Sequence, residues 1–455
     1  MATQNMTVGD PVKLLVAFSL PLLIGNVFQQ LYNLADAVVV GNTLGVGPFA
    51  AVGSTGSVMF LIFGGFFGLT GGFGVVTAQR FGASDEAGVR HSIATSTYIS
   101  IALGAIITVL GAWGTRPILT LMDTPPDIFA DAELYLRVIF YGTLTGVFYN
   151  LVATILRSLG DSRTPLVALI IASVINIVLD LFFICVLKTG VDGAAWATNL
   201  SQLLAAAWCL RYVYPRLPLL HLRRADWRFD WRAVQKHLLI GVPMALQFSI
   251  TALGVVVLQK VLNSLGTASV AAYAAAGKLD QFTIMPLFSV GMAMVTYAAQ
   301  NYGARHYDRI QLGVRKCQQV VLAGCVLGSI VIVLFGRPLI IFFIGGAEED
   351  VLNLAEIFLL THAITYPLLG LIFVYRNVLQ GVGRAILPML AGLMEMAARV
   401  FAALLLVPLL GFWGACLSNP LAWLSADVLL IAAYRAWTRS REMRAFRKLE
   451  LKVES

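Results

Sequence analysis

The chain repeats itself, because short motifs of its first half recur in the same order in its second half. Four pairs of positions mark the repeat, each roughly 221 to 223 residues apart: Pro21 and Pro243, Gly82 and Gly303, Gly160 and Gly383, and Gly190 and Gly411. Chance matches would not keep one order and one offset, so the sequence predicts two homologous halves. Duplicated halves around a shared site are a common plan of secondary transporters.

The composition places both halves in a membrane. Of the 455 residues, 58% are hydrophobic and only 12% are charged, whereas soluble domains carry about 25% charged residues. A spanning helix needs about 20 mostly apolar residues, so we expect an all-α membrane protein with about twelve spans. The predicted spans cover residues 12–38, 48–73, 91–113, 132–156, 164–187, 193–214, 236–262, 268–298, 316–336, 351–378, 385–408 and 413–435.

One connection interrupts the spans and falls between the two repeats. Prolines, arginines and aspartates gather there, at residues 215–235. We predict an N-terminal six-helix lobe (1–214), this cytoplasmic basic linker, a C-terminal six-helix lobe (236–438) and a cytoplasmic tail (439–455). Because each half holds an even number of spans, the two repeats should enter the membrane in the same direction.

The net charge of +8 could suggest a nucleic-acid partner, but the distribution of the charge indicates topology instead. Lys and Arg gather in every second loop, and the other loops are nearly bare of them. By the positive-inside rule, both termini are cytoplasmic. We therefore expect a multi-pass protein of the cytoplasmic (inner) membrane that binds no nucleic acid. The first span, after Lys13, is too long for a signal peptide, so we expect it to be retained.

The sequence lacks motifs of catalysis and nucleotide binding. It contains no HExxH, GxSxG, kinase or P-loop motif, and the glycine cluster at residues 64–74 is typical of close helix packing inside a span. The five cysteines form no CxxC pair and indicate neither a disulfide framework nor a metal cluster. We expect no enzymatic activity, no cofactor and no use of ATP, so an ion or solute gradient must drive any transport.

Polar side chains line one face of the first span. The spacing i, i+3, i+4, i+7 gathers four residues on that face: Gln29, Tyr32, Asn33 and Asp36. An acid at the bilayer centre costs about 2.5 to 3.5 kcal/mol on insertion scales, so this face should contact protein or water. Pro21, two turns earlier, should bend or loosen the helix and is the predicted hinge.

The fifth and sixth spans carry a matching set of polar residues. Asn176 and Asp180 are four residues apart on the fifth span, as are Thr198 and Gln202 on the sixth. With Asp36, their oxygen atoms could form a site for a small monovalent cation. They could also form a proton site, because two close carboxylates in a dry pocket cannot both ionise cheaply. The alternative is a buried hydrogen-bond network that only holds the lobe together.

Charged residues of the second half allow two interpretations. Lys278 and Asp280 lie inside the eighth span, and Glu395 and Arg399 of the eleventh have the spacing of a helical ion pair. Structural ion pairs are the favoured interpretation, and a role in substrate binding or coupling is the alternative. His362, the only histidine deep in a span, is interpreted as a satisfied core residue.

An ordered set of motifs resembles the multidrug and toxic compound extrusion (MATE) transporters. The motifs are the run from Pro21 to Asp36 with Gly41 and residues 50–53 after it, Gln79-x-x-Gly-Ala83, Arg157-Ser-Leu-Gly-Asp161 with Pro165, and Asn176-x-x-x-Asp180. The similarity covers essentially the whole chain. It implies two six-helix lobes in a V shape, alternating access and a functional monomer. It also implies export of organic, often cationic and amphipathic, compounds in exchange for H⁺ or Na⁺.

The resemblance assigns roles to particular residues. In many bacterial and archaeal members a coupling cation binds in the first lobe, at positions that match four residues here and would ligate Na⁺ in a sodium-coupled protein: Asp36, Asn176, Asp180 and Thr198. The other polar residues within the spans are candidates for the cavity and for substrate contacts: Gln29, Tyr32, Asn33, Gln202, Lys278, Asp280, Glu395 and Arg399.

One departure from the family concerns the second lobe. The NorM branch also uses acids on the seventh and tenth spans, whereas residues 241–258 contain no acid here, and Glu356 lies near the outer end of its span. The sequence therefore does not favour a second-lobe sodium site, and coupling would fall on the first lobe.

Three alternative functions were weighed against an antiporter. A flippase or exporter of a lipid-linked precursor or metabolite in the same superfamily usually carries extra helices and a strongly basic cavity, and neither is evident. A membrane enzyme acting on lipid would need a His, Asp and Ser set at one interface, which five scattered histidines do not supply. A channel would not need two lobes with buried carboxylates in only one.

Overall fold

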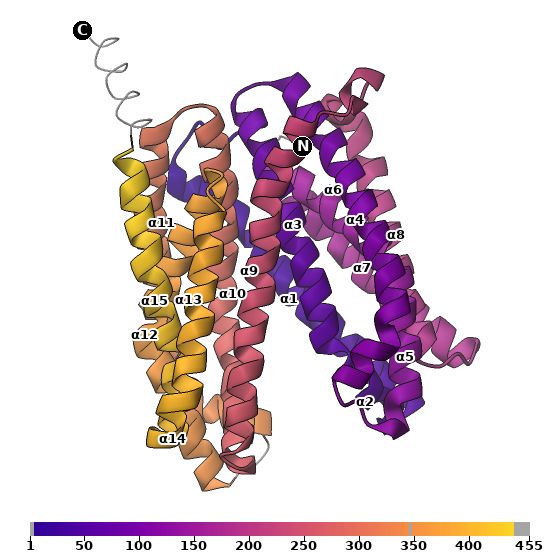
Figure 1. Ribbon diagram of the computed structural model, residues 1–455, viewed down its shortest axis with the longest axis vertical. Helices are drawn as coiled ribbons and strands as arrows, with labels where there is room; N and C mark the ends of the chain where they lie inside the picture. The colour runs from indigo at the N-terminus through magenta and orange to yellow at the C-terminus, as the bar shows by residue number, and fades with distance from the viewer. Residues whose placement is uncertain (1–3, 345–347, 441–455) are drawn as a thin grey trace. The chain divides into compact units, whose positions relative to one another are not determined.

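The computed structural model describes residues 4–344 and 348–440. The regular elements of these residues are all helices, with no strand among them (Figure 1). The first half contains α1 (Pro11–Leu44), α2 (Val46–Ser54), α3 (Gly56–Gly82), α4 (Glu86–Leu121), α5 (Pro126–Tyr141), α6 (Thr143–Ser158), α7 (Arg163–Leu181) and α8 (Val191–Val213). The second half contains α9 (Trp231–Asn263), α10 (Thr267–Gly303), α11 (Tyr307–Ile344), α12 (Glu349–Gly381), α13 (Ile386–Phe401), α14 (Val407–Leu410) and α15 (Phe412–Thr438). Shorter turns are η1 (Phe182–Val186) and η5 (Ala402–Leu406), both π-helical, and the 3-10 turns η2 (Tyr214–Arg216), η3 (Pro218–Leu220) and η4 (Arg224–Trp227).

The chain is an all-α membrane protein. Ten helices of the described residues are long and apolar enough to cross a membrane, and the bent pair α5 and α6 makes an eleventh span. The sixth predicted span, 193–214, coincides with α8, which is not among those eleven. Its first half carries Asn199 and Gln202, and these polar side chains lower its apolarity.

The two halves share unusual backbone features at matching positions, which confirms the duplication. Positive φ angles recur at three pairs: Gly45 and Gly266 (both 94°), Ser84 and Arg305 (56° and 61°), and Gly160 and Gly383 (87° and 84°). The π-helical turns η1 and η5 also occupy corresponding places, after α7 and after α13. Because positive φ is uncommon outside glycine, the pair Ser84 and Arg305 is a specific mark of common descent.

Internal contacts divide the chain into two compact units, and the division falls inside two helices. Unit 1 is built around Leu20–Ala245, and unit 2 around Met6–Ser19 and the chain from Leu246 onward. The start of the chain therefore packs with second-half helices, where the backbone N–H of Met6 donates to Gln300 Oε1 at 2.8 Å. The predicted tail, 439–455, lies outside the described residues except for its first two positions.

In unit 1, α3 packs against α4 and α6, and α7 packs against α8 (Figure 1). The glycine cluster serves close helix packing, as predicted. A Cβ atom on Gly72 would lie 2.4 Å from Gly241 Cα, on the first part of α9, so no larger residue fits at this crossing. In unit 2, α12 packs against α10, α11 and α15, and α13 packs against α15.

The break between α5 and α6 is filled by a side chain of α8. The two helices are bent by 49°, and Asn199 Nδ2 donates to the carbonyl oxygen of Val138 at 2.8 Å. A Cβ atom on Gly142, at the break, would lie 1.9 Å from Asn199 Cγ. The amide thus gives the Val138 carbonyl a second hydrogen bond beside the one from the backbone N–H of Gly142 at 3.1 Å, and only glycine leaves room for it.

Candidate functional site

Three helices of unit 1 bring together the polar residues expected at a coupling site. Asp36 comes from α1, and Asn176 and Asp180 come from α7, where both are fully buried. Thr198 of α8 is 6% exposed. The carboxyl groups of Asp36 and Asp180 are electrostatic neighbours. Residues that are 144 positions apart in sequence thus form one cluster, as the helix spacing suggested.

Asn176 and Tyr32 tie this cluster to α8. In the amide orientation that satisfies its neighbours, Asn176 donates to Asp180 Oδ2 at 2.9 Å and accepts from the backbone N–H of Thr198 at 3.3 Å. The Tyr32 hydroxyl donates to Thr198 Oγ1 at 3.3 Å. These bonds fix the positions of the side chains that surround the two carboxyl groups.

The two carboxyl groups keep oxygen atoms free for a ligand. Asp36 Oδ1 and Asp180 Oδ1 are shielded from solvent and have no hydrogen-bond partner among the described residues. Two buried carboxylates in contact repel each other unless a proton or a cation lies between them. The cluster can therefore bind H⁺ or a small monovalent cation through carboxylate oxygens, with the hydroxyl oxygen of Thr198 nearby.

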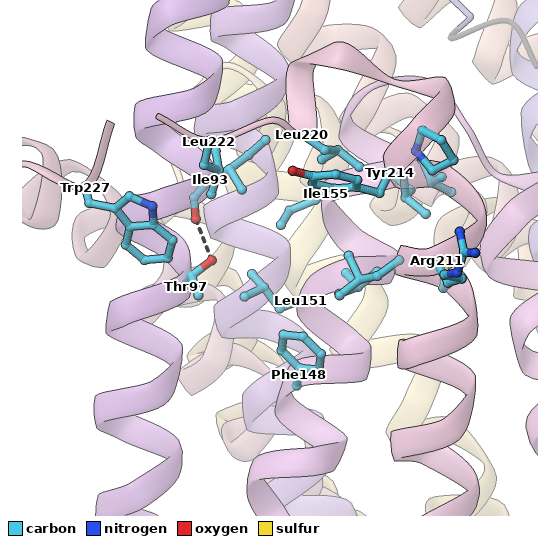
Figure 2. A pocket seen from close by; sticks show the side chains of 16 residues that line it. Ile93, Thr97, Phe148, Leu151, Ile155, Arg211, Tyr214, Leu220, Leu222 and Trp227 are labelled. Carbon is cyan, nitrogen blue, oxygen red and sulfur yellow. Dashed lines mark hydrogen bonds between the residues drawn. The ribbon is translucent and has the colours of Figure 1, made fainter. Parts of the chain in front are cut away.

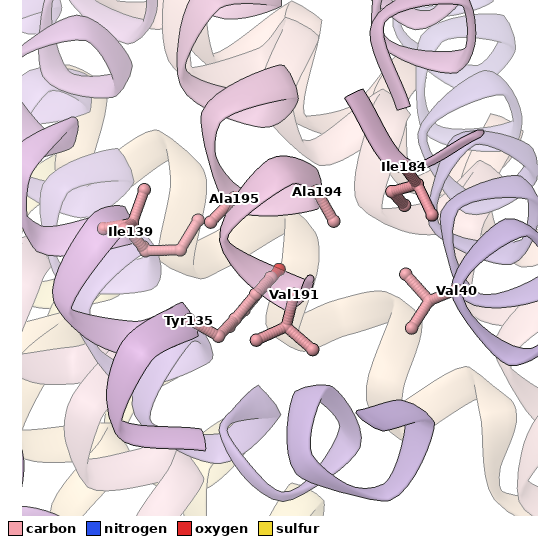
Figure 3. Packing of buried hydrophobic residues seen from close by; sticks show 8 residues of the cluster. Val40, Tyr135, Ile139, Ile184, Val191, Ala194 and Ala195 are labelled. Atoms are coloured by element: carbon pink, nitrogen blue, oxygen red, sulfur yellow. The ribbon is translucent and has the colours of Figure 1, made fainter. Parts of the chain in front are cut away.

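An apolar layer lies about one helical turn beyond the polar cluster. Val40 follows Asp36 by four residues, Ile184 follows Asp180 by four, and Ala194 precedes Thr198 by four. These side chains belong to one buried cluster with Tyr135 of α5, and Figure 3 shows them converging from α1, α5, η1 and α8. The layer closes one end of the site with hydrocarbon, through which a hydrated ion does not pass cheaply.

The remaining first-half candidates lie apart from the carboxyl pair. Gln29 Nε2 donates to Asn33 Oδ1 at 3.3 Å in an exposed hydrogen bond. The polar face of α1 is therefore more accessible at these two amides than at Asp36, which is partly buried. Gln202 lies against Gly146 of α6 instead, because a Cβ there would meet its Oε1 at 2.8 Å. Pro21 is buried within α1, which continues through it as helix.

In unit 2, Asp280 belongs to a buried hydrogen-bond network with α12. The Tyr366 hydroxyl donates to Asp280 Oδ1 at 2.6 Å, and His362 Nδ1 donates to Oδ2 at 2.9 Å. His362 is fully buried, as its interpretation as a core residue requires, although its Nε2 has no partner among the described residues. Lys278, two residues before Asp280, is exposed and takes no part in this network.

A second charged group of unit 2 surrounds Glu395. The predicted pair with Arg399 is present at 3.5 Å, and Arg376 forms a shorter ion pair with the same carboxylate. Arg376 lies inside the unit because α12 continues to Gly381. Asp427 of α15 lies near this group, buried, and both of its carboxyl oxygens lack a partner among the described residues.

Two residues of these sites were missed by the sequence analysis. Asp427 is an acid inside an apolar span, so the criterion that selected Asp36 would have found it. Tyr135 of α5 lies near Asp36 and Tyr32 and packs with Val40. No spacing in the sequence predicts this position, since it depends on how α5 packs against α8.

Comparisons with known proteins agree with this architecture. The family model described as MatE matches residues 21–182 and 243–405. The chain is similar to the probable multidrug resistance protein YpnP of Bacillus subtilis (strain 168), at 29% identity over 392 residues, 84% of this chain and 85% of that protein. It is also similar to an FAD transporter of Shewanella oneidensis, at 23% identity over 379 residues, 82% of each chain.

Solved structures show the same fold. A crystal structure of a MATE protein in a bent conformation superposes with a TM-score of 0.89, at 25% identity, and covers 98% of both chains. The two matched segments of the family model begin at Pro21 and Pro243, the prolines that mark the repeat in the sequence.

Proposed function

The chain belongs to the MatE family, and we propose that it is an antiporter that exports organic compounds in exchange for H⁺ or Na⁺. The names of its relatives, which include probable multidrug resistance proteins and multidrug export proteins, support this direction of transport. We expect the exported compounds to be cationic and amphipathic.

The observation that carries the proposal is the carboxyl pair of unit 1. Asp180 is fully buried and Asp36 is partly buried, the two carboxyl groups are neighbours, and each keeps a shielded, unpartnered oxygen. Such a pair releases or binds a cation according to the side of the membrane it faces. A membrane potential of 100 mV supplies about 2.3 kcal/mol for each charge that crosses, which is enough to bias a two-state cycle.

The cycle follows from differential binding. A cation bound between Asp36 and Asp180 removes their repulsion and favours one conformation of α1 near Pro21, whereas the empty pair favours another. A ligand shifts such an equilibrium only by its difference in affinity for the two states. We propose that the cation-loaded state has released substrate outside, and that cation release inside admits the next substrate.

Orientation and assembly belong to the same proposal. The basic linker and loops support cytoplasmic termini in the inner membrane. The carboxyl pair, the apolar layer and the hydrogen bonds of the site all come from one unit of one chain, which supports function as a monomer. Ion exchange supplies the energy, so no ATP is needed.

The test is efflux of a fluorescent cationic dye from proteoliposomes that contain the purified protein. A proton gradient and a sodium gradient are imposed separately, and the gradient that drives dye movement identifies the coupling ion. Asp36→Asn and Asp180→Asn should each abolish gradient-driven efflux, because an amide cannot exchange a proton or hold a cation by charge.

The matched control is Asp127→Asn, an exposed acid in the first turn of α5, which should transport like the original protein. All variants must elute from size exclusion as the original protein does. Normal efflux by both Asp36→Asn and Asp180→Asn would contradict the coupling role. Dye movement under neither gradient would contradict drug export.

A second candidate substrate class is a charged metabolite. The similarity to an FAD transporter supports this class, because the match to that relative covers 82% of this chain. The same vesicles loaded with flavin nucleotides distinguish the two classes, since an exporter of metabolites would move the flavin and ignore the cationic dye.

A further inference from the structure

A cavity of about 540 Å³ lies on unit 1 beneath the linker between the repeats. Its walls come from α4, α6 and α8, and its roof comes from the linker. Figure 2 shows Leu220 and Leu222 on the roof, Phe148 and Leu151 on the floor, and Trp227 and Arg211 at opposite ends. Nothing in the proposed transport cycle uses this cavity, which is separate from the carboxyl pair.

A second cavity continues the first along the same helices. It has a volume of about 220 Å³ and shares Thr97, Phe148 and Leu151 with the larger one. The two together extend along α6 from Leu156 to Leu144. Twelve residues of helix rise about 18 Å, which is roughly the depth of one hydrocarbon leaflet. The pair of cavities is therefore a groove as long as an acyl chain.

The lining of the groove suits a ligand that has a hydrocarbon chain inside the groove and a negatively charged group at its opening. Nearly all of its side chains are apolar, and Arg211 is the cation among them. Arg211 is exposed and forms no ion pair among the described residues. Tyr214 and Trp227, which also line the larger cavity, are 53% and 45% exposed. Aromatic side chains of this kind are enriched at the level of lipid headgroups.

The linker is fastened over the groove. His91 Nδ1 bonds to the carbonyl oxygen of Asp226 at 2.9 Å, and Arg90 forms an ion pair with the Asp226 carboxylate at 3.5 Å. Leu217, Leu220 and Leu222 pack in turn against buried residues of α4, α6 and α8. The connection between the repeats is thus a fixed roof, and whatever fills the groove contacts it directly.

We propose that this groove binds one acyl chain of an anionic phospholipid of the cytoplasmic leaflet, with the phosphate beside Arg211. The leaflet follows from the orientation proposed above, because the basic linker marks the cytoplasmic side. An apolar groove of this length matches an acyl chain, and the arginine at its mouth matches a phosphate by charge. The same arginine repels a cationic drug, so the groove is a lipid site rather than a second export site.

The test measures lipid binding to the delipidated protein in detergent by native mass spectrometry. Phosphatidylglycerol should bind and raise the midpoint of thermal unfolding, and phosphatidylcholine should bind about fivefold more weakly, from the contribution of one arginine near an anionic group. Arg211→Gln should remove this preference and leave residual binding of both lipids. Arg163→Gln, an exposed arginine that does not line the groove, should retain the preference.

A second variant tests the apolar part. Thr97 lies where the two cavities meet and is partly accessible, so Thr97→Phe should fill the groove without repacking the core and abolish binding of both lipids. Unchanged binding by Thr97→Phe, or an unchanged headgroup preference in Arg211→Gln, would overturn the proposal. So would displacement of the lipid by the transported dye. These measurements involve no transport, so they stand or fall independently of the antiport assays.

Discussion

Acids within the helices of this protein differ in how their oxygen atoms are satisfied, and the difference separates Asp280 from the site proposed to exchange a cation. Asp280 accepts two hydrogen bonds, from Tyr366 and His362. Asp36 and Asp180 instead face each other with one unpartnered oxygen apiece. The oxygen atoms of Asp280 are thus already occupied by fixed donors, whereas those of Asp36 and Asp180 leave room for a proton or a cation between the two acids.

The first prediction at the residue scale concerns Asp280. Asp280→Ala removes the partner of two buried polar groups, so the free energy of unfolding should fall by about 3 kcal/mol, the lower range for breaking a buried pair. Thermal denaturation in detergent measures this loss. Lys278→Ala, an exposed change two residues away on α10, should leave the midpoint where it is. Equal midpoints for both variants would show that the network does not stabilise unit 2.

Residue-level prediction from the sequence worked where helix spacing decides contact. The pairs Asn176 with Asp180 and Glu395 with Arg399 each lie one turn apart on one helix, so their sequence positions suffice. The contact of Arg376 with Glu395 could not be predicted in this way, because the two residues lie on different helices. Tyr135 could not have been found, since its neighbours lie on other helices.

At the scale of elements, the apolar layer beyond the carboxyl pair should act as a seal. Val40 is fully buried in it, so Val40→Ser should let water reach Asp36 and make the vesicles lose an imposed proton gradient several-fold faster without substrate. Val38→Ser, on the same helix but at a half-exposed position (50%), is the control and should not leak. A proton leak measured with a pH-sensitive dye that is equal in the two variants would contradict the seal.

The break between α5 and α6 allows a second test among elements. Gly142→Ala places a methyl group on the side chain of Asn199, and overpacking of this kind costs about 1 to 3 kcal/mol. The cost should shrink in an Asn199→Ala background, where the obstructing amide is gone. A double-mutant cycle by thermal denaturation gives the coupling energy, with Gly53→Ala as the control, since nothing lies within 4 Å of that position. Additive losses would mean that Asn199 does not define the break.

At the scale of the whole molecule, the duplication gives two similar units but one carboxyl pair. By the offset of 222 residues that relates Pro21 to Pro243, the position of the second half that corresponds to Asp36 is Leu258. The duplicated fold could be predicted from the sequence because turns and spans repeat. The sequence also predicted that the second half has no acid at the position that corresponds to Asp36. The division of the chain inside α1 and α9 could not be predicted. The sequence of a continuous helix does not show that its first turns pack against a different unit from the rest.

From that division we predict a shared role for the two repeat prolines. Pro21 lies two residues after the change of unit in α1, and Pro243 lies just before the change in α9. A proline inside a helix removes a backbone hydrogen bond and eases bending there. If α1 and α9 bend at these points in every cycle, Pro21→Ala and Pro243→Ala stiffen the helix.

An added bending cost of about 1.4 kcal/mol would slow dye efflux roughly tenfold, while the thermal midpoint holds or rises because a helical hydrogen bond is restored. Pro117→Ala changes a proline inside α4, away from either boundary, and should leave the rate of efflux unchanged. If all three variants export the dye at the same rate, bending at Pro21 and Pro243 is not part of the transport cycle. A slower rate in Pro21→Ala alone would instead confine the bending to α1, the helix that carries Asp36, and so to the unit that is proposed to bind the cation.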